Sequence, residues 1–450
     1  MQLRQDGNHT PRQRQIMNKR ILQIALPAIA TNITVPLLGM VDVAIVGHLG
    51  DAVYIGAIAV GSMIFNLIYW VFGFLRMGTS GMTAQAKGGR RLGEVTDLMV
   101  RSLKIALLIA LLIFVFQGVL KDIALRLIHP PADVVPLASL YFNTVVWGAP
   151  AVMALYAVSG WFIGMENTRI PMVVSLLQNV VNIVCSVLLV YGFGMKVEGV
   201  ALGTVIAQYA GTLAALALWW RYYRRLWKYR KVSAKEERTF TFRDFFAVNS
   251  DIFLRSLFLV AVNLFVLEKG AIQGTQILAV NTLLMQFYII FSYFMDGFAY
   301  AGEAIGGKYW GAGNAPSFDR LVCRLFGWGV GMAAAFTAAY FLGGSFLLHI
   351  LTDDRSVIEA STPFFFWVLL LPLAGMAAFI WDGIFIGVTA TKGMLFATCL
   401  SAVIFFTILH FLFGTMGNHA LWMAFDAFLL ARGLCQTIWF VVIRSRWMPA

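Results

Sequence analysis

Long apolar segments follow one another along the whole chain, and this succession limits the possible folds more than any other feature. Each segment is about the 20 residues that an α-helix needs to cross a hydrocarbon core of about 30 Å. Of the 450 residues, 60% are hydrophobic and 12% are charged, which is not the composition of a soluble protein of this length. The segments lack the apolar–polar alternation of transmembrane β-strands. The sequence therefore predicts an all-α polytopic membrane protein.

Twelve segments are predicted to cross the membrane, as two lobes of six helices joined by a basic linker. Their centres lie near Thr34, Ile64, Leu108, Pro150, Asn182, Thr212, Phe258, Phe287, Ala334, Leu370, Ile404 and Leu430. We expect a polar tail at 1–16, an N-terminal lobe at 17–220, the linker at 221–243, a C-terminal lobe at 244–443 and a tail at 444–450. No cleavable signal peptide is predicted, and Met17 would be a natural start of the chain.

The formal net charge of +12 is distributed unevenly. If the spans alternate, most Lys and Arg residues fall on the side of both termini, which the positive-inside rule identifies as the cytoplasm. This distribution argues against a nucleic-acid-binding role. The basic linker is also suited to contact the anionic headgroups of membrane lipids.

The chain contains an internal repeat. Gly160–Arg169 and Gly383–Lys392 both fit the pattern G-x-F-I-G-x-x-x-T-[RK], and the offset between these two segments defines the spacing of the repeat. A weaker alignment sets Gly50–Arg90 against Gly270–Trp310. Six spans per repeat would place both halves in the same orientation, related by a pseudo-twofold axis along the membrane normal. Parallel repeats of this kind are typical of transporters that work by alternating access.

Asp42 is the candidate for the central chemistry. It lies among apolar residues of the first predicted span, where a charge costs about 2.5–3.5 kcal/mol, and such residues usually line a transport pathway. A carboxyl group removed from water favours its neutral form, so a buried Asp42 is expected to exchange a proton near neutral pH. The alternative is a permanently neutral Asp42 that packs helices through hydrogen bonds.

Two prolines precede Asp42 in the same span. Pro27 cannot donate a hydrogen bond to the carbonyl of Gln23, and Pro36 cannot donate to that of Asn32. A helix with two such breaks can bend, and its carbonyls can accept a proton, an ion or water. The alternative interpretation is a static kink.

A second group of polar residues lies in the fifth predicted span. Gln178, Asn182 and Ser186 recur every four residues and form one helical stripe, with Asn179 beside it. The stripe is a candidate substrate or ion site. Amide stripes also hold transmembrane helices together, and the sequence leaves both interpretations open.

The C-terminal half offers three candidate acids. Asp296 and Glu303 are seven residues apart and are expected on one helix face, and Asp382 lies near the end of the tenth span. Arg255 and Arg432 are expected to extend to a helix end, although pairing with an acid such as Asp296 is the alternative. The four cysteines are interpreted as small buried apolar residues, not as disulfides or metal ligands: Cys185, Cys323, Cys399 and Cys435.

No enzyme template is found: the chain has no Walker loop, no histidine cluster with metal spacing and no G-x-S-x-G motif. Without a nucleotide-binding motif, uphill transport would use an ion gradient. We therefore expect a secondary transporter with no cofactor and no resident metal.

Several motifs together resemble the MATE (multidrug and toxic compound extrusion) family, and within it the DinF-type branch. They cover nearly the whole chain from about Met17: Ala25–Pro27, Asn32–Asp42, Gly47–Leu49, Leu75-Arg76 with Thr83–Gln85, Asp296–Ala299 and Asp382–Gly387. The resemblance implies a twelve-helix exporter of the bacterial inner membrane, with two lobes and cytoplasmic termini. It would exchange cationic or amphipathic compounds for protons or sodium ions. Membrane lipids are its expected surroundings, and a monomer is its expected state.

The resemblance also implies roles for individual residues. Protonation of Asp42 would change the bend of the first helix at Pro27 and release the substrate from the N-terminal lobe. The family's site in this lobe corresponds to Tyr141, Asn182 and Thr204, and Ser186 stands where several relatives carry a second aspartate. This replacement favours proton coupling, with a sodium-coupled exporter or a flippase for lipid-linked oligosaccharides as alternatives. The full candidate set for the N-lobe site is Asn32, Tyr141, Gln178, Asn179, Asn182, Ser186 and Thr204.

Overall fold

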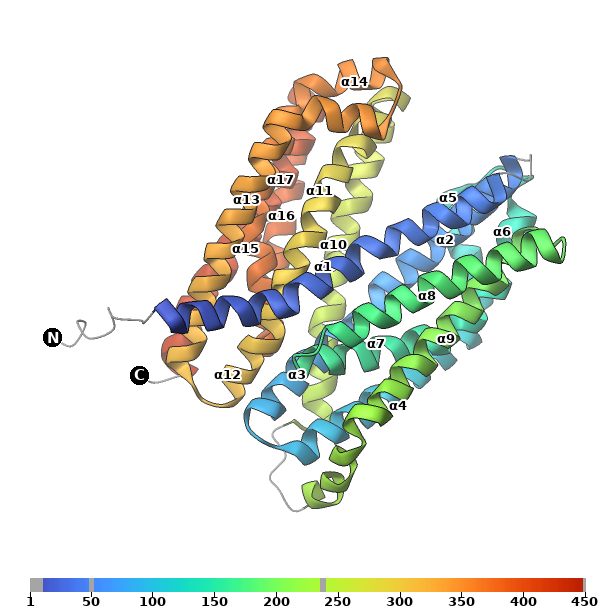
Figure 1. Ribbon diagram of the computed structural model, residues 1–450. Helices are drawn as coiled ribbons and strands as arrows, with labels where there is room; N and C mark the ends of the chain where they lie inside the picture. The colour runs from blue at the N-terminus through green and yellow to red at the C-terminus, as the bar shows by residue number, and fades with distance from the viewer. Residues whose placement is uncertain (1–10, 48–51, 235–239, 448–450) are drawn as a thin grey trace. The chain divides into compact units, whose positions relative to one another are not determined.

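The computed structural model describes residues 11–47, 52–234 and 240–447. Inside the helices, the side chains of residues 11–13, 35–38, 40, 52, 231–234, 242, 443 and 445–447 also lie outside the description. Within the described ranges the chain forms helices joined by short turns, and no β-strand occurs there (Figure 1). The prediction of an all-α fold is confirmed.

The helices of the first half begin with a 37-residue helix that contains both Pro27 and Asp42. They are α1 (Pro11–Gly47), α2 (Ala52–Phe72), α3 (Phe74–Gly88), α4 (Leu92–Val115), α5 (Gln117–Ile128), α6 (Val135–Val145), α7 (Ala149–Gly164), α8 (Arg169–Val187) and α9 (Val197–Tyr223). Short 3₁₀ or π turns accompany them at η1 (Val146–Gly148), η2 (Leu188–Gly192) and η3 (Arg224–Ala234).

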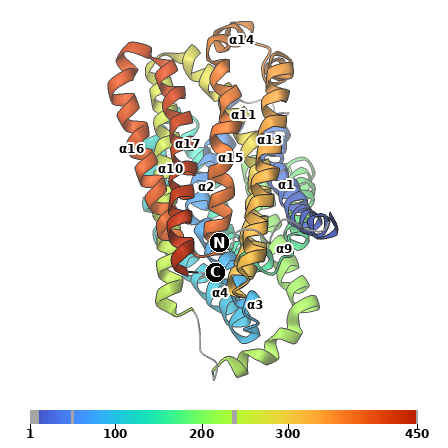
Figure 2. The same ribbon diagram turned by 90° about the vertical axis from the view of Figure 1, so that its left-hand side faces the viewer.

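The second half repeats this organisation with long helices that run beside one another (Figure 2). They are α10 (Phe242–Ile272), α11 (Thr275–Ala301), α12 (Gly307–Gly311), α13 (Ala315–Leu351), α14 (Arg355–Ser361), α15 (Phe365–Gly387), α16 (Thr391–Met416) and α17 (Asn418–Trp447). A π turn, η4 (Gly302–Gly306), joins α11 to α12, and the 3₁₀ turn η5 (Thr362–Phe364) precedes α15.

Eleven described segments are long and apolar enough to cross a membrane. They correspond to the second to twelfth predicted spans. The first predicted span, centred on Thr34, falls in α1, which is partly outside the described side chains. At 1.5 Å per residue, the 37 residues of α1 extend over about 55 Å, more than a hydrocarbon core requires.

The described residues form two compact units. One lies within Ala30–Asn249, and the other lies within Ser250–Ala450 together with Met1–Ile29. One boundary between the units therefore falls inside α1, two residues after Pro27, and the other falls inside α10, after Asn249. The predicted lobe bounds of 17–220 and 244–443 remain a prediction. Residues 11–16, expected in a polar tail, form the first turns of α1.

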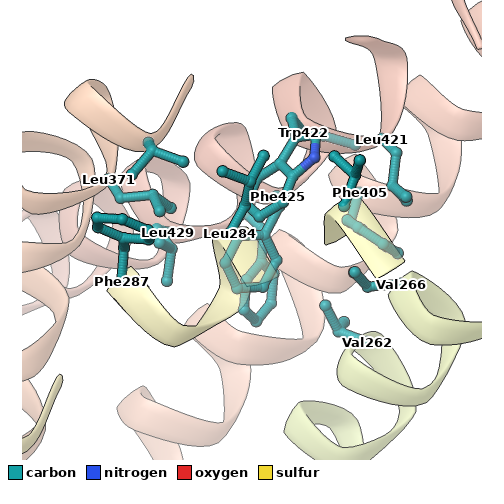
Figure 3. Close-up of a cluster of buried hydrophobic side chains, with 14 of the residues drawn as sticks. Val262, Val266, Leu284, Phe287, Leu371, Phe405, Leu421, Trp422, Phe425 and Leu429 are labelled. Carbon is teal, nitrogen blue, oxygen red and sulfur yellow. The ribbon is translucent and has the colours of Figure 1, made fainter. Parts of the chain in front are cut away.

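Apolar side chains form the core of the C-terminal unit. Phe287, Leu284 and Leu371 pack with aromatic residues of α16 and α17, including Phe405 and Trp422 (Figure 3). The Tyr340 hydroxyl donates to the backbone carbonyl of Phe287 within this core, at 2.7 Å. Helices that are apolar nearly all round can pack in this way because their outer faces meet lipid.

The predicted repeat has a structural basis in glycines that allow two backbones to touch. A β-carbon at Gly160 would collide with the carbonyl oxygen of Arg76. A β-carbon at Gly383, the counterpart of Gly160, would collide with the carbonyl oxygen of Ala299. Ala299 is in turn the counterpart of Arg76, because these two residues are as far apart in number as Gly160 and Gly383. The second glycine of each motif repeats the pattern: Gly164 meets the carbonyl of Ser80, and Gly387 meets that of Glu303.

Left-handed backbone positions follow the same spacing. Glu166 and Thr389 have φ angles of 60° and 54°, and Arg90 and Gly313 have 59° and 64°. In both pairs the two residues are as far apart in the sequence as Gly160 and Gly383. The spacing of the repeat therefore also holds around Arg90. The weaker alignment, which paired Arg90 with Trp310, is therefore wrong in register, because Gly313 is the counterpart of Arg90.

Candidate functional site

Asp42 lies in the second half of α1 and is buried inside the N-terminal unit, with 4% of its surface exposed. Among the described residues, its Oδ1 atom has no hydrogen-bond partner, and no Lys or Arg forms an ion pair with the carboxyl group. A buried ionised carboxylate without a partner costs several kcal/mol, so such a group favours its protonated form or a bound cation. Asp42 is therefore a buried acid whose charge, when ionised, no described cation neutralises.

Tyr141 of α6 connects Asp42 to polar residues of three other helices. Its buried hydroxyl lies 3.3 Å from the hydroxyl of Ser62 in α2 and near that of Thr204 in α9, and Asp42 acts on it electrostatically. The Asn182 amide of α8 donates to the Thr204 hydroxyl at 3.0 Å. The structure thus brings together Asp42, Tyr141, Asn182 and Thr204.

The polar stripe of α8 packs against α9. A β-carbon at Gly211 would collide with the side chain of Gln178, and one at Gly203 would collide with the Ser186 hydroxyl. Asn182 lies between Gln178 and Ser186 on the stripe, and its amide donates to the hydroxyl of Thr204, which also belongs to α9. The stripe therefore holds α8 and α9 together, as its alternative interpretation expected.

Two atoms of this stripe remain unsatisfied. The Asn182 Oδ1 and Ser186 Oγ atoms are buried and have no hydrogen-bond partner among the described residues. Each can accept a hydrogen bond or coordinate a cation. The stripe is therefore both a structural contact and part of the polar cluster around Tyr141.

Asn179 lies beside the stripe and contacts α1. Its amide donates to the backbone carbonyl of Thr34 at 3.2 Å, and the Thr34 hydroxyl lies 3.3 Å from that of Ser175. Farther along, the Tyr191 hydroxyl donates to the carbonyl of Ile45 at 2.8 Å. These bonds hold α1 at points before and after Asp42. The accessory candidate Asn32 lies half-buried on α1 just before this section.

Of the two helix-bending candidates, Pro27 and Pro36, the structure describes the side chain of Pro27 alone. Pro27 lies within α1, in the part that belongs to the C-terminal unit. Pro36 also falls in α1, but its side chain lies outside the described residues. The proposed bend therefore stays a prediction for both prolines.

In the C-terminal unit, Asp382 is enclosed by donors. The guanidinium groups of Arg255 and Arg432 and the amide of Gln436 all donate to its carboxylate, with distances of 3.1 Å for Arg432 and 2.7 Å for Gln436. Arg255 and Arg432 are 5% and 2% exposed. The expectation that they extend to a helix end is wrong, because pairing with Asp382 allows them to remain buried.

The other two predicted acids of this unit have different environments. Asp296 is half-buried on α11 and acts electrostatically on Arg255 and Tyr288, so it belongs to the same charged cluster. Glu303 is 1% exposed and lies in the π turn η4, not in α11. The α-helical period that was expected to align the two acids does not continue through Glu303.

Asp426 of α17 was missed by the sequence reasoning. It is 7% exposed, and neither carboxylate oxygen has a hydrogen-bond partner among the described residues. The signal was available, because Asp426 stands between Phe425 and Phe428 in an apolar segment, as Asp42 does in its own segment. Asp426 is therefore the natural comparison for Asp42 in experiments.

The described part of the chain contains no group of three or more His, Cys, Asp or Glu residues placed to hold a metal ion. The four cysteines are free thiols, but the expectation that all are buried is wrong for Cys323, which is exposed. The N-terminal cluster offers one carboxyl group surrounded by hydroxyl and amide groups. Such a set can bind a proton, a monovalent cation or the cationic group of a small molecule.

Comparison with known proteins supports the internal repeat and relates most of the chain to one family. The MatE family model matches twice, at residues 27–188 and 251–412. DNA damage-inducible protein F of Escherichia coli K12 is 36% identical over 429 residues, which are 94% of this chain and 92% of that protein. A probable multidrug resistance protein NorM of Thermotoga maritima is 24% identical over 77% of this chain and 74% of its own length.

Solved structures show the same fold. The crystal structure of a MATE protein in its bent conformation superposes with a TM-score of 0.83, at 18% identity, over 98% of this chain and 99% of that chain. The Vibrio cholerae MATE transporter VcmN in the bent form gives a TM-score of 0.82 at 16% identity, over 96% and 98% of the two chains. The prediction of two lobes is confirmed by this likeness. The chain belongs to the MatE family, whose members are transporters of the multidrug and toxic compound extrusion type and not enzymes.

Proposed function

We propose that this protein exports cationic or amphipathic compounds in exchange for protons, and that Asp42 is the residue that binds the proton. The family and the relatives named as multidrug resistance proteins support drug export. The proposal includes a bacterial inner membrane and cytoplasmic termini, which the distribution of Lys and Arg favours.

The observation that carries the proposal is the environment of Asp42. Its carboxyl group is buried, its Oδ1 atom has no partner among the described residues, and the Tyr141 hydroxyl is near. A structural aspartate would be satisfied by donors, as Asp382 is by Arg255 and Arg432. Asp426 also lacks partners, but Asp42 in addition acts on the Tyr141 hydroxyl, which lies beside the hydroxyls of Ser62 and Thr204.

In this mechanism the ionised carboxylate of Asp42 attracts a cationic substrate to the N-terminal unit. Hydroxyl and amide groups of Tyr141, Thr204 and Asn182 orient the substrate. A proton arriving from outside neutralises Asp42, which removes the attraction and releases the substrate. Because the bound proton and the bound cation compete for one carboxylate, their transport is coupled.

The first helix would transmit this event. Asp42 belongs to one compact unit, whereas Pro27 on the same helix belongs to the other. Pro27 removes one backbone hydrogen bond, so bending at this point is less costly than in an uninterrupted helix. A change in the hydrogen bonds around Asp42 would therefore favour a change in the bend of α1.

The coupling ion is proposed to be the proton because Ser186 provides no second charge. A Ser186 hydroxyl is a weaker sodium ligand than a carboxylate, and the site has Asp42 as its acidic residue. Sodium coupling is the alternative for the same site. A lipid-flipping role would require exposed positive charge, whereas the buried Arg255 and Arg432 face Asp382.

The test is ethidium efflux in bacteria that lack their main drug pumps, with the wild type and three variants expressed at matched levels. We expect Asp42→Asn to abolish efflux driven by a pH gradient, and Asp426→Asn, its buried counterpart, to retain efflux. Ser186→Asp should introduce sodium dependence. If Asp42→Asn keeps proton-driven efflux, the site assignment is wrong. If sodium alone drives the wild type, the ion assignment is wrong.

A further inference from the structure

A pocket of about 800 Å³ lies in the C-terminal unit, and its lining does not include Asp382, Arg255 or Arg432. It is formed by the first turns of α1, by Tyr309 of α12 and by the first turns of α13. Because α13 is one of the membrane-crossing helices and the pocket is at its N-terminal end, the pocket lies at the membrane boundary. Neither the family relationship nor the proposed transport mechanism explains it.

The charged side chains that line this pocket are mostly cations. Among the described lining residues are four arginines, at positions 14, 20, 320 and 324, and one acid, Asp319. The carboxylate of Asp319 is already paired with Arg444, which does not belong to the lining. The acid therefore does not neutralise the arginines, and the pocket presents a positive field.

Two of the arginines are held in fixed positions beside hydroxyl groups. The Arg20 guanidinium donates to the Tyr309 hydroxyl at 2.8 Å, and the Arg320 guanidinium donates to the Ser317 hydroxyl at 2.9 Å. Each hydroxyl accepts from an arginine and keeps its own proton to donate. An arginine next to a hydroxyl donor suits the oxygens of a phosphate group.

The beginning of α13 adds to this field. Pro316 and Ser317 of its first turn line the pocket, and Asn314 caps the helix by accepting from the Ser317 amide. The N-terminus of a 37-residue helix carries a partial positive charge that favours anions. The helix end and the arginines therefore act in the same direction.

The pocket also has apolar walls. Ile16, which is 53% exposed, lines it together with Met17 and Cys323. Free inorganic phosphate gains nothing from such walls, whereas a lipid places its glycerol and first methylene groups against them. The combination of basic, hydroxyl and apolar groups at a membrane boundary matches a phospholipid headgroup.

We infer that this pocket binds the phosphate headgroup of an anionic membrane lipid. The bound lipid connects the first turns of α1 with α12 and α13 inside the C-terminal unit. Since α1 continues to Asp42, the lipid steadies the starting half of the helix that carries the proposed proton site. The lipid site itself does not depend on that proposal.

The test uses the purified full-length protein and measures lipid binding by native mass spectrometry after titration with phosphatidylglycerol or phosphatidylcholine. The variant Arg320→Gln/Arg324→Gln removes two pocket arginines. Its matched control, Arg126→Gln/Arg355→Gln, removes two exposed arginines that lie outside both the pocket and the basic linker. At about 1 kcal/mol per arginine near anionic lipid, the pocket variant should bind phosphatidylglycerol roughly 30-fold more weakly. The control should bind as the wild type does.

A second measurement keeps the wild-type chain and so does not depend on the folding of a variant. Cys323 is exposed in the pocket, whereas Cys185, Cys399 and Cys435 are partly buried elsewhere. Phosphatidylglycerol should slow maleimide labelling of Cys323, and phosphatidylcholine should not. Equal binding by the pocket and control variants overturns the inference. Equal protection of Cys323 by inorganic phosphate overturns the assignment to lipid.

Discussion

Removal of the Asp382 charge should destabilise the C-terminal unit more than removal of any exposed acid. The Asp382 carboxylate accepts from Arg255, Arg432 and Gln436, and its side chain is 10% exposed. The substitution Asp382→Asn keeps the size of the side chain and one acceptor oxygen. It leaves two buried guanidinium groups without the carboxylate that pairs directly with both of them.

The expected magnitude follows from burial. Breaking a buried ion pair costs about 3–5 kcal/mol, because the remaining charge stays in a poorly polarisable environment. For a unit of about 200 residues, each kcal/mol lowers the midpoint of thermal unfolding by about 2–4 °C. Asp382→Asn should therefore lower the midpoint by about 6–20 °C.

The control is Asp319→Asn, in the same unit. Asp319 also pairs with an arginine, Arg444, but the two side chains are 33% and 49% exposed. Exposed pairs contribute about 0–1 kcal/mol, so the midpoint should fall by no more than about 4 °C. The assay is tryptophan fluorescence of the purified proteins in detergent, heated at one fixed rate. Equal midpoints for the two variants would refute the reasoning from burial.

Three further predictions concern close packing and a helix cap. Gly61→Ala should displace the Tyr141 ring, which a β-carbon would meet, and lower drug efflux, while Gly118→Ala, with open space around it, should not. Gly383→Ala should push α15 away from the Ala299 carbonyl and destabilise the C-terminal unit by about 1–3 kcal/mol in thermal unfolding, with Gly414→Ala as the unaffected control. Hydrogen bonds from Ser356 and Val357 lower the pKa of Asp354 from its ordinary value of 3.8. The ionised cap therefore stabilises α14 above that value, so the stability difference between wild type and Asp354→Ala should be constant from neutral pH to about pH 5 and shrink as the pH falls below about 4.

The fold could be predicted from the sequence because lipid imposes a simple rule on each helix. Every span must be apolar over about 20 residues, and such runs are visible one at a time. The repeat was visible at Gly160 and Gly383, where backbone contacts require glycine. The weaker alignment pairs Arg90 with the wrong residue. Lipid-facing positions accept many different apolar residues, so few identities remain there to define how the two segments align.

The candidate site was only partly predictable. The isolated positions of Asp42 and of the stripe through Asn182 mark them in the sequence, but the sequence does not show which helix each side chain meets. Asn179 contacts α1, whereas Asn182 contacts α9, although they are close neighbours on the same helix. The pairing of Arg255 with Asp382 joins residues that are far apart in the chain, and no local pattern reports such a contact.

The most direct test of the central claim is the protonation of Asp42 itself. Infrared difference spectroscopy of the protein in proteoliposomes, recorded as the pH is stepped or ethidium is added, detects the carbonyl stretch of protonated carboxyl groups. We predict a carboxyl band that ethidium diminishes, that is absent in Asp42→Asn and that persists in Asp426→Asn. A band unchanged in Asp42→Asn, or lost in Asp426→Asn instead, would contradict the account.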